Sequence, residues 1–306
     1  MRDKIHGYLL GAALGDALGK PTEFLSIKDI HATYGPEGIR ELEENAVWTD
    51  DTQMIIYGGK AMVEVFSSGK QKQIDAVAET IAKHYIEWLD DPGHAPGNTC
   101  LQGVYNLKKG IHWRASGVAT SKGCGSVMRS GIFGIFYRDE VLKQIASISG
   151  KMTHGHPTAD AACVAGALSI AHVLEGKSPT EISELLMQET RNMSEEFTQI
   201  LGKARDLADS SVDDYHGLTT LGQGWVGDEA FAMSFFLFLR HPDDFEKAVV
   251  VGANHSGDTD SVASIAGGMI GARIGAQKLP KKWIERLTNV EVLLELGDRI
   301  FEVYLF

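Results

Sequence analysis

Two series of glycines, each at four-residue intervals, constrain the fold of this chain more than any other feature. In a helix of about 3.6 residues per turn, this spacing puts every member of a series on one face. Glycine inside a helix costs about 0.5 to 1 kcal/mol relative to alanine, so its repeated use needs a compensating gain, usually close approach to another helix. We therefore expect two buried, tightly packed helices near the two ends of the chain. The first series is Gly7, Gly11, Gly15 and Gly19, and the second is Gly267, Gly271 and Gly275.

Helical periodicity also dominates the rest of the chain. Runs with alternating polarity or dense β-branching, which would indicate strands, are short and scattered. The prediction is an all-α fold in which residues 1–306 form one domain, with the polar stretch 205–224 as a long connection. The expected helices cover residues 4–18, 51–67, 72–89, 99–109, 139–149, 158–175, 180–189, 195–208, 227–239, 243–253, 260–276 and 292–304.

The composition excludes several classes of partner. Acidic residues outnumber basic ones by 41 to 29, giving a net charge of −12. Nucleic acid is therefore an unlikely partner, because binding it by counterion release needs clustered Lys and Arg. The acidic balance fits either solubility alone or a protein that concentrates carboxylates around a cation. We find no signal peptide, and no stretch of 18 apolar residues lacks a charge, so no membrane partner is expected.

The three cysteines, Cys100, Cys124 and Cys163, indicate a reducing compartment. They are odd in number and lack spacings such as C-x-x-C, which argues against a disulfide framework and against a zinc site of the usual cysteine type. A cytoplasmic location is the expectation.

Two short acidic segments stand out, residues 48–52 (Trp-Thr-Asp-Asp-Thr) and 254–261 (Asn-His-Ser-Gly-Asp-Thr-Asp-Ser), each just before a long predicted helix. Either segment alone reads as a helix cap, because a Thr or Asp oxygen accepts from the free N–H groups of the first turn. Together they hold more oxygen than two caps require, and Mg²⁺ and Mn²⁺ select such ligands. The pairing predicts a site for two divalent ions built from Thr49, Asp50, Asp51, Asp258, Asp260 and Ser261.

Aspartate clusters on helices also occur in Mg²⁺-dependent diphosphate lyases and prenyl-transfer enzymes, so this class is the second enzymatic hypothesis. Its usual D-D-x-x-D pattern is missing, because Thr52, Gln53 and Met54 follow Asp50 and Asp51.

Several motifs in a fixed order resemble the ADP-ribosylglycohydrolase family, and the resemblance spans nearly the whole chain. It starts with the glycine-rich segment 11–19 and the Pro-Thr-Glu-Phe segment 21–24, and it includes both acidic segments. The remaining matches are residues 123–129 (Gly-Cys-Gly-Ser-Val-Met-Arg), Thr153-His154, and residues 224–226 (Gly-Trp-Val) with Glu229.

This resemblance implies a compact, orthogonally packed helical domain with two Mg²⁺ or Mn²⁺ ions in a cleft, held by the six ligands named above. It also implies that Glu23 is a catalytic carboxylate and that Asp258 serves catalysis as well as metal binding. The loop Gly123, Cys124, Gly125 and Ser126 would bring its backbone N–H groups to a diphosphate, and His154 would lie near the ADP-ribose.

Each of these roles has a structural alternative. The glycine loop also reads as a tight turn, and Glu23 as a solvated loop charge, as most glutamates are. His156 and His255 receive no role, because a lone histidine is more often a hydrogen-bonded structural residue. Trp225 and Glu229 read as a helix start and core, and we leave them out of the predicted site.

The reaction implied by the resemblance is hydrolysis at the anomeric carbon of the ribose distal to adenine, releasing ADP-ribose from a modified protein or another acceptor. A non-catalytic module that only binds ADP-ribose is the third hypothesis. One departure affects the acceptor: at residues 95–99, where arginine-directed relatives carry an acidic residue before the glycine, this chain has Ala95 and Pro96. Asp90 and Asp91 lie a few residues upstream and offer a substitute charge.

Overall fold

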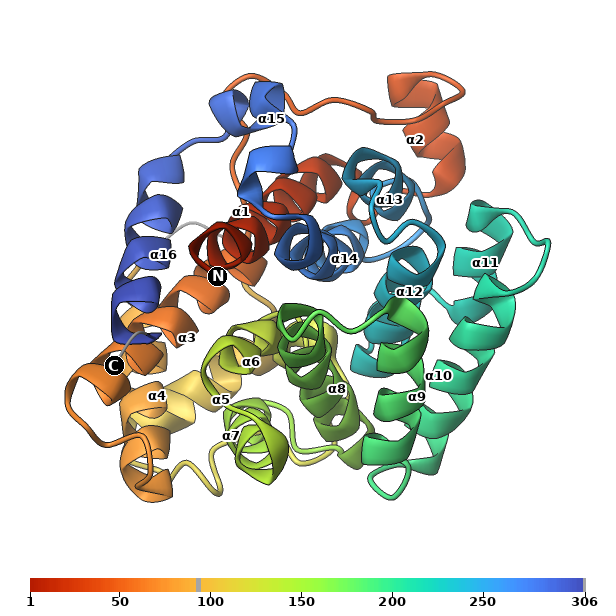
Figure 1. The fold of residues 1–306 in the computed structure, drawn as a ribbon. Coiled ribbons are helices and arrows are strands. Elements are labelled where there is room, and N and C mark those ends of the chain that lie inside the picture. Colours follow the sequence, from red (N-terminus) through yellow and green to blue (C-terminus); the bar gives the residue numbers. More distant parts are fainter. Residues whose placement is uncertain (92–94, 305–306) are drawn as a thin grey trace.

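The computed structural model describes residues 1–91 and 95–304, and within these ranges the chain is helical with no strand. Helices α1 (Arg2–Gly19) and α14 (Thr259–Ile274) lie side by side near the middle of the molecule, although they come from opposite ends of the sequence (Figure 1). The predicted all-α fold is confirmed.

Both glycine-striped helices are buried and tightly packed, as predicted, and the structure shows that they pack against each other through backbone contacts. A Cβ added at Gly11 would overlap the carbonyl oxygen of Gly267, and a Cβ added at Gly267 would overlap that of Gly11. Gly7 and Gly271 face each other in the same reciprocal way. The small side chains let the helix axes approach far closer than packed larger residues would permit. Gly275 is the exception, because α14 ends at Ile274 and Gly275 terminates it with a φ of 86°.

Gly11→Ala should therefore destabilise the protein by about 1 to 3 kcal/mol or more, because a new methyl group would meet a backbone carbonyl that cannot move alone. The matched control is Gly202→Ala in α10 (Glu195–Ala208), where the nearest atom to an added Cβ is 3.8 Å away. That control should be neutral or stabilise by up to about 1 kcal/mol through helix propensity. Chemical denaturation of both variants measures the difference, and equal stabilities would contradict close packing of α1 on α14.

Every segment predicted as helical is helical, with ends displaced by a few residues at most. The corresponding helices, besides α1, α10 and α14, are α3 (Asp50–Ser67), α4 (Ile74–Trp88), α5 (Asn98–Lys108), α7 (Asp139–Lys151), α8 (Pro157–Leu174), α9 (Pro179–Thr190), α12 (Gly227–Arg240), α13 (Phe245–Gly252) and α16 (Val290–Tyr304).

Short helices escaped the sequence analysis, namely α2 (Ile27–Tyr34), α6 (Phe133–Phe136), α11 (Asp214–Leu221) and α15 (Lys281–Arg286). The expectation that 205–224 is a plain connection is wrong, since α11 lies inside it. Asp213 starts α11 by accepting from the His216 N–H at 3.0 Å, and Gly222, with a φ of 144°, follows its last residue. Helices of this length show only about two turns of periodicity, which is too little to recognise.

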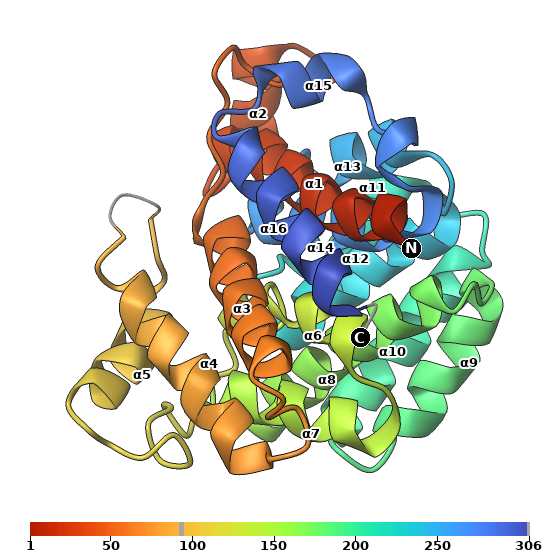
Figure 2. The same ribbon diagram turned by 60° about the vertical axis from the view of Figure 1, so that its left-hand side comes forward.

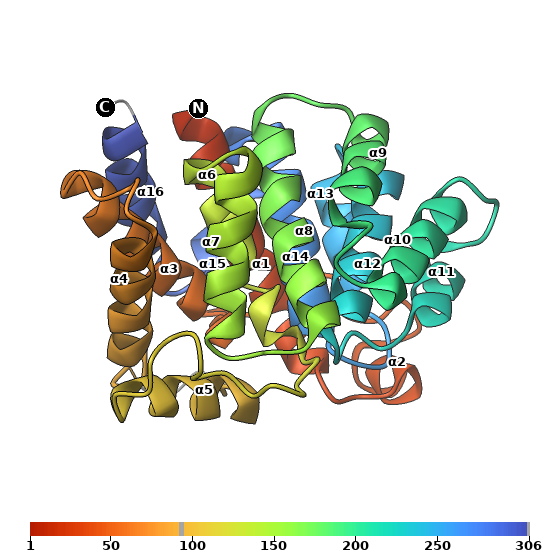
Figure 3. The ribbon, with the colours of Figure 1, turned by 90° about the horizontal axis from the view of Figure 1, so that it is seen from below.

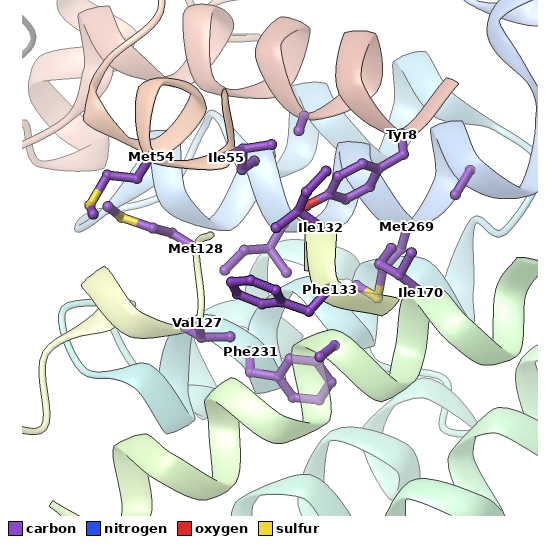
Figure 4. Packing of buried hydrophobic residues seen from close by; sticks show 14 of the residues in the cluster. Tyr8, Met54, Ile55, Val127, Met128, Ile132, Phe133, Ile170, Phe231 and Met269 are labelled. Carbon is purple, nitrogen blue, oxygen red and sulfur yellow. The ribbon is translucent and has the colours of Figure 1, made fainter. Parts of the chain in front are cut away.

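The helices pack around a single buried cluster of hydrophobic residues. Figure 2 shows α3 and α4 side by side with α5 beyond them, and in Figure 3 α5 runs across the ends of α4 and α7. The core combines side chains from distant parts of the sequence, including Tyr8, Ile55, Phe133, Ile170 and Phe231 (Figure 4).

Helix α8 is long and apolar enough, by length and composition, to cross a membrane. However, 94% of its 18-residue window is buried inside the protein, where it packs against α7, α12 and α14. These contacts are those of a central core helix.

Candidate active site

The two acidic segments meet at one pocket because each one lies at the start of a helix, and both helices begin at that pocket. Thr49 is the N-cap of α3 and accepts from the Asp51 N–H at 3.3 Å, while Asp258 is the N-cap of α14 and accepts from the Ser261 N–H at 3.3 Å. These segments therefore cap their helices and also bring their carboxylates to one pocket. The pocket has a volume of about 410 Å³, and its walls include Glu23, Asp50, Asp51, Asp258, Asp260 and Ser261.

Glu23 is fixed beside the second acidic segment. It follows the short helix η1 (Lys20–Thr22), which extends α1. The Thr22 hydroxyl contacts the Ala253 carbonyl at 2.7 Å and the Thr259 hydroxyl at 3.1 Å. One carboxylate oxygen each from Glu23, Asp258 and Asp260 lie within 4.8 Å of one another. The structure thus places Glu23 with the predicted metal ligands rather than in open solvent.

Asp16, in the glycine-rich segment 11–19, supports this site, although the sequence alone predicted no role for it. It is fully buried in α1 and accepts hydrogen bonds from the Thr49 N–H at 2.9 Å and from the Thr52 N–H and hydroxyl at 3.0 and 2.6 Å. Asp16 therefore orients the first turn of α3, which carries Asp50 and Asp51. The available signal was an ionisable residue in the otherwise uncharged, glycine-striped stretch 7–19 of α1.

Crowding of carboxylates changes their acidity. Burial, followed by repulsion from neighbouring carboxylates, raises the pKa of both Glu23 and Asp50 to about 8. The same two causes raise the pKa of Asp51 and Asp258 well above the usual range. Burial raises the pKa of Asp260, and burial with repulsion from Asp260 raises that of Asp16 to about 7. Without a cation, the carboxyl groups of such a cluster favour their protonated form, and a bound cation would favour the ionised form.

The pocket fits divalent cations by its donor set. Five carboxylates line it, and none of the described lining residues is a lysine or arginine. Asp51 is 3% exposed, and its Oδ1 has no hydrogen-bond partner among the described residues. A buried carboxylate oxygen without a donor is costly, and a hard cation satisfies it.

Stability without divalent ions should therefore fall as pH rises from about 4 to about 8. Over this window the folded protein binds more protons than the unfolded chain, because the ordinary carboxyl pKa lies near 4 and the folded values of Glu23, Asp50 and Asp16 lie near 7 to 8. Mn²⁺ competes with these protons, so it should raise the unfolding temperature more at about pH 8 than at about pH 5. Equal shifts at both pH values, measured by differential scanning calorimetry, would argue against cations in this cluster.

The predicted substrate loop forms another part of the wall. Gly123, Cys124 and Gly125 line the pocket, whereas Ser126 is fully buried and its hydroxyl donates to the Ala159 carbonyl at 3.4 Å. The N–H groups of Gly125 and Ser126, at the start of the turn η2 (Cys124–Ser126), make no hydrogen bond within residues 1–91 and 95–304. Free N–H groups of this kind suit an anionic ligand.

His154 and the glycine loop are held together by Arg129, a fully buried residue. The Arg129 guanidinium donates to the Gly125 carbonyl and, at 2.7 Å, to the Thr153 hydroxyl, which contacts His154 Nδ1 at 2.8 Å. Gly125 has no room for a side chain, because an added Cβ would lie 2.5 Å from Cys100 Sγ and 2.9 Å from His154 Cε1. Burial and the nearby Arg129 lower the pKa of His154 to about 3, so the imidazole is neutral.

An aromatic pair closes one side of the pocket. Phe24 and Trp225 stack with ring centroids 4.9 Å apart, and Phe24 is 75% exposed with a φ of 65°. Trp225, which we left out of the predicted site, therefore belongs to its wall. Glu229 does not line the pocket; it accepts from the Gln223 and Gly224 N–H groups at 2.9 and 3.2 Å and shapes the loop that carries Trp225.

Residues 95–99 form another part of the wall and bring no charge to it. Asp91 accepts from the Tyr57 hydroxyl at 3.2 Å, Asp90 pairs with Lys108 at 2.9 Å, and neither lines the pocket. The suggested substitute charge is thus absent from the described lining.

The two histidines without a predicted role stay outside the lining. His156 caps α8 by accepting from the Thr158 N–H at 3.1 Å, which is a structural role. His255 is 1% exposed, and burial lowers its pKa to about 4.

A larger hollow of about 910 Å³ lies between α2, α11 and α13. Its carboxylates differ from those of the first pocket because lysine and arginine side chains pair with them. Lys282 pairs with Glu41 at 2.6 Å, and Arg40 pairs with Glu37 at 2.7 Å. The unneutralised cluster therefore marks the smaller pocket as the candidate site.

Comparisons with known proteins agree with this fold. A family model described as ADP-ribosylglycohydrolase matches residues 1–305. An ADP-ribosylarginine hydrolase of Serratia proteamaculans is 25% identical over 98% of this chain and 79% of its own. The ADP-ribosyl-dinitrogen reductase glycohydrolase of Rhodospirillum rubrum is 25% identical over 94% of this chain and 91% of its own. A solved ADP-ribosylglycohydrolase-related protein complex has the same fold, with a TM-score of 0.76, 20% identity, and coverage of 99% of this chain and 98% of that one.

Proposed function

Because the chain belongs to the ADP-ribosylglycohydrolase family, we propose that it hydrolyses the glycosidic bond between ADP-ribose and a modified acceptor with the help of two Mg²⁺ or Mn²⁺ ions. The observation that carries this proposal is the pocket of five carboxylates without a lysine or arginine in its described lining. The metal ligands would be Thr49, Asp50, Asp51, Asp258, Asp260 and Ser261.

Bound divalent ions would supply Lewis acidity, orienting the ribose hydroxyls and making a water more acidic near neutral pH. Glu23 would hold or move the proton exchanged between that water and the leaving group. Its pKa of about 8, raised by burial and then by Asp260, lies in the range where a carboxyl group both gains and loses protons near neutral pH. Glu23 lies within 4.8 Å of Asp258 and Asp260, at the side of the pocket where the reacting bond would meet the ligands.

The glycine loop at residues 123–126 would bind the diphosphate. The N–H groups of Gly125 and Ser126 are free, and Arg129 holds the loop in place through the Gly125 carbonyl. The neutral His154 would add a hydrogen-bonding group without a charge beside the glycine loop. Phe24 and Trp225 would shield the same pocket from bulk water.

Family membership argues against the diphosphate lyase and prenyl-transfer hypothesis, because those enzymes belong to other families. A module that only binds ADP-ribose would keep the pocket but release no product. We also propose, as the cysteine pattern suggests, that the protein works in the cytoplasm; its three cysteines are free thiols.

The acceptor is tested by offering substrates of defined linkage. Purified protein with Mg²⁺ or Mn²⁺ should release free ADP-ribose from at least one of three substrates, with the sugar attached to arginine, to serine or to a nucleotide. Since residues 95–99 bring no carboxylate to pair with a guanidinium, we expect no preference for the arginine linkage. Tight ADP-ribose binding without release from any substrate would replace hydrolysis by the binding-module hypothesis.

A further inference from the structure

The thiol of Cys124 points at the proposed metal ligands. Its Sγ lies 2.9 Å from Asp258 Oδ2, to which the thiol donates, and 3.7 Å from Ser261 Oγ. Cys124 is the first residue of η2 and lines the same 410 Å³ pocket as the five carboxylates. The Cys124 sulfur therefore contacts two of the proposed oxygen ligands, which lie at the start of α14.

A second observation, at Asp51, also points to a cation in this region. Asp51 lines the pocket, and only 3% of the residue is exposed. Its Oδ1 has no hydrogen-bond partner among the described residues. Its other oxygen, Oδ2, contacts the Thr49 hydroxyl at 3.4 Å. The pocket thus presents an unsatisfied buried oxygen as well as the sulfur.

The other cysteines have different surroundings. Cys163 is fully buried and contacts the carbonyl oxygens of Ser126 and Ala146 at 3.4 and 3.3 Å. Cys100 touches Arg129 Nη1 at 3.8 Å and the Gly125 carbonyl at 3.9 Å. Of the three thiols, Cys124 is the one that contacts a proposed metal ligand.

We propose that Cys124 is itself a metal ligand. One of the two ions would then be bound by the Cys124 sulfur together with oxygens of Asp258 and Ser261. The inference rests on the proposed function, because it presumes that ions bind these carboxylates. As the sulfur–metal bond forms, the thiol proton passes to solvent. Soft thiolate ligands favour ions such as Co²⁺, Zn²⁺ and Cd²⁺, whereas the oxygens at the start of α3 favour Mg²⁺ and Mn²⁺.

The absence of C-x-x-C spacing, which argued against a cysteine-type zinc site, does not bear on this position. Its donors are one sulfur and carboxylate or hydroxyl oxygens, brought together across 134 residues by the packing of η2 against the start of α14. No local spacing can reveal such a set.

Titration with Co²⁺ tests the proposal through absorbance rather than activity. Wild-type protein should develop a near-ultraviolet sulfur-to-cobalt charge-transfer band, and Cys124→Ser should lose it while calorimetry still detects Co²⁺ binding. Cd²⁺ affinity should fall roughly tenfold or more in Cys124→Ser, with a much smaller change for Mg²⁺. Cys163→Ala is the matched control and should keep the band.

Each other outcome is decisive. Co²⁺ binding without a charge-transfer band in the wild type, or a band that survives in both Cys124→Ser and Cys124→Ala, would overturn the sulfur ligand and leave the oxygen site of the proposed function intact. Failure of Co²⁺, Mg²⁺ and Mn²⁺ alike to bind the folded wild-type protein would overturn both. Circular dichroism establishes that the variants are folded, and Cys124→Ala supplies a second variant if Cys124→Ser is not.

Discussion

Asp258→Asn should reduce turnover of an ADP-ribosylated substrate roughly a hundredfold or more, equivalent to about 2.7 kcal/mol of lost transition-state stabilisation. The change removes a negative charge from the point where Glu23 and Asp260 converge while keeping nearly the same shape. Folding should survive, because Asn caps a helix about as well as Asp and can still accept from the Ser261 N–H. Affinity for divalent ions and for ADP-ribose should fall together with the rate.

Asp244→Asn is the matched control for this variant. Asp244 also caps a helix, accepting from the Lys247 N–H at 3.1 Å at the start of α13, but it is exposed and does not line the carboxylate pocket. This control should leave turnover and metal affinity unchanged. If Asp258→Asn kept the wild-type rate at limiting metal concentration, its assignment as a ligand would be wrong.

Glu23→Gln should lower the rate of the chemical step by about 10² to 10⁴, the usual contribution of a positioned acid or base. The amide keeps the size and hydrogen-bonding capacity of the carboxyl group but cannot carry a proton. ADP-ribose affinity should therefore change little, in contrast to Asp258→Asn, which acts on both affinity and rate. Single-turnover hydrolysis beside calorimetry of ADP-ribose binding separates the two effects.

A loop glutamate outside the pocket provides the comparison for Glu23. The side chain of Glu37 is 72% exposed and pairs with Arg40, so Glu37→Gln should behave as wild type. Normal single-turnover cleavage by Glu23→Gln would return Glu23 to the status of a solvated loop charge, despite its position among the carboxylates.

The parts of the fold that follow local rules could be predicted from the sequence. The glycine stripes and long amphipathic segments predicted the helices and the tight packing of α1 and α14, because helix period and close approach leave a direct mark on residue choice. That these two helices pack against each other was not predicted. The acidic segments were identified because helix starts concentrate oxygen side chains, and in the structure Thr49 and Asp258 are indeed N-caps of helices that begin at one pocket.

What remained hidden depends on contacts between distant residues. Asp16 supports the start of α3 from another helix, and Arg129 joins Gly125 to Thr153 through the core. The stacking of Phe24 on Trp225 joins residues 201 positions apart along the sequence, roughly two-thirds of the chain. Pairings of this kind are set by tertiary packing, so no periodicity or spacing announces them.

Metal-dependent hydrolysis is tested most directly by measuring ADP-ribose release against the number of divalent ions bound per chain. Protein stripped of metal should release no ADP-ribose, and activity should return as Mg²⁺ or Mn²⁺ is added, reaching its maximum when two ions are bound per chain. Bound metal is counted by elemental analysis on the same samples used for single-turnover hydrolysis. Full activity in protein shown to contain no metal would contradict the claim that this carboxylate pocket acts by holding divalent ions.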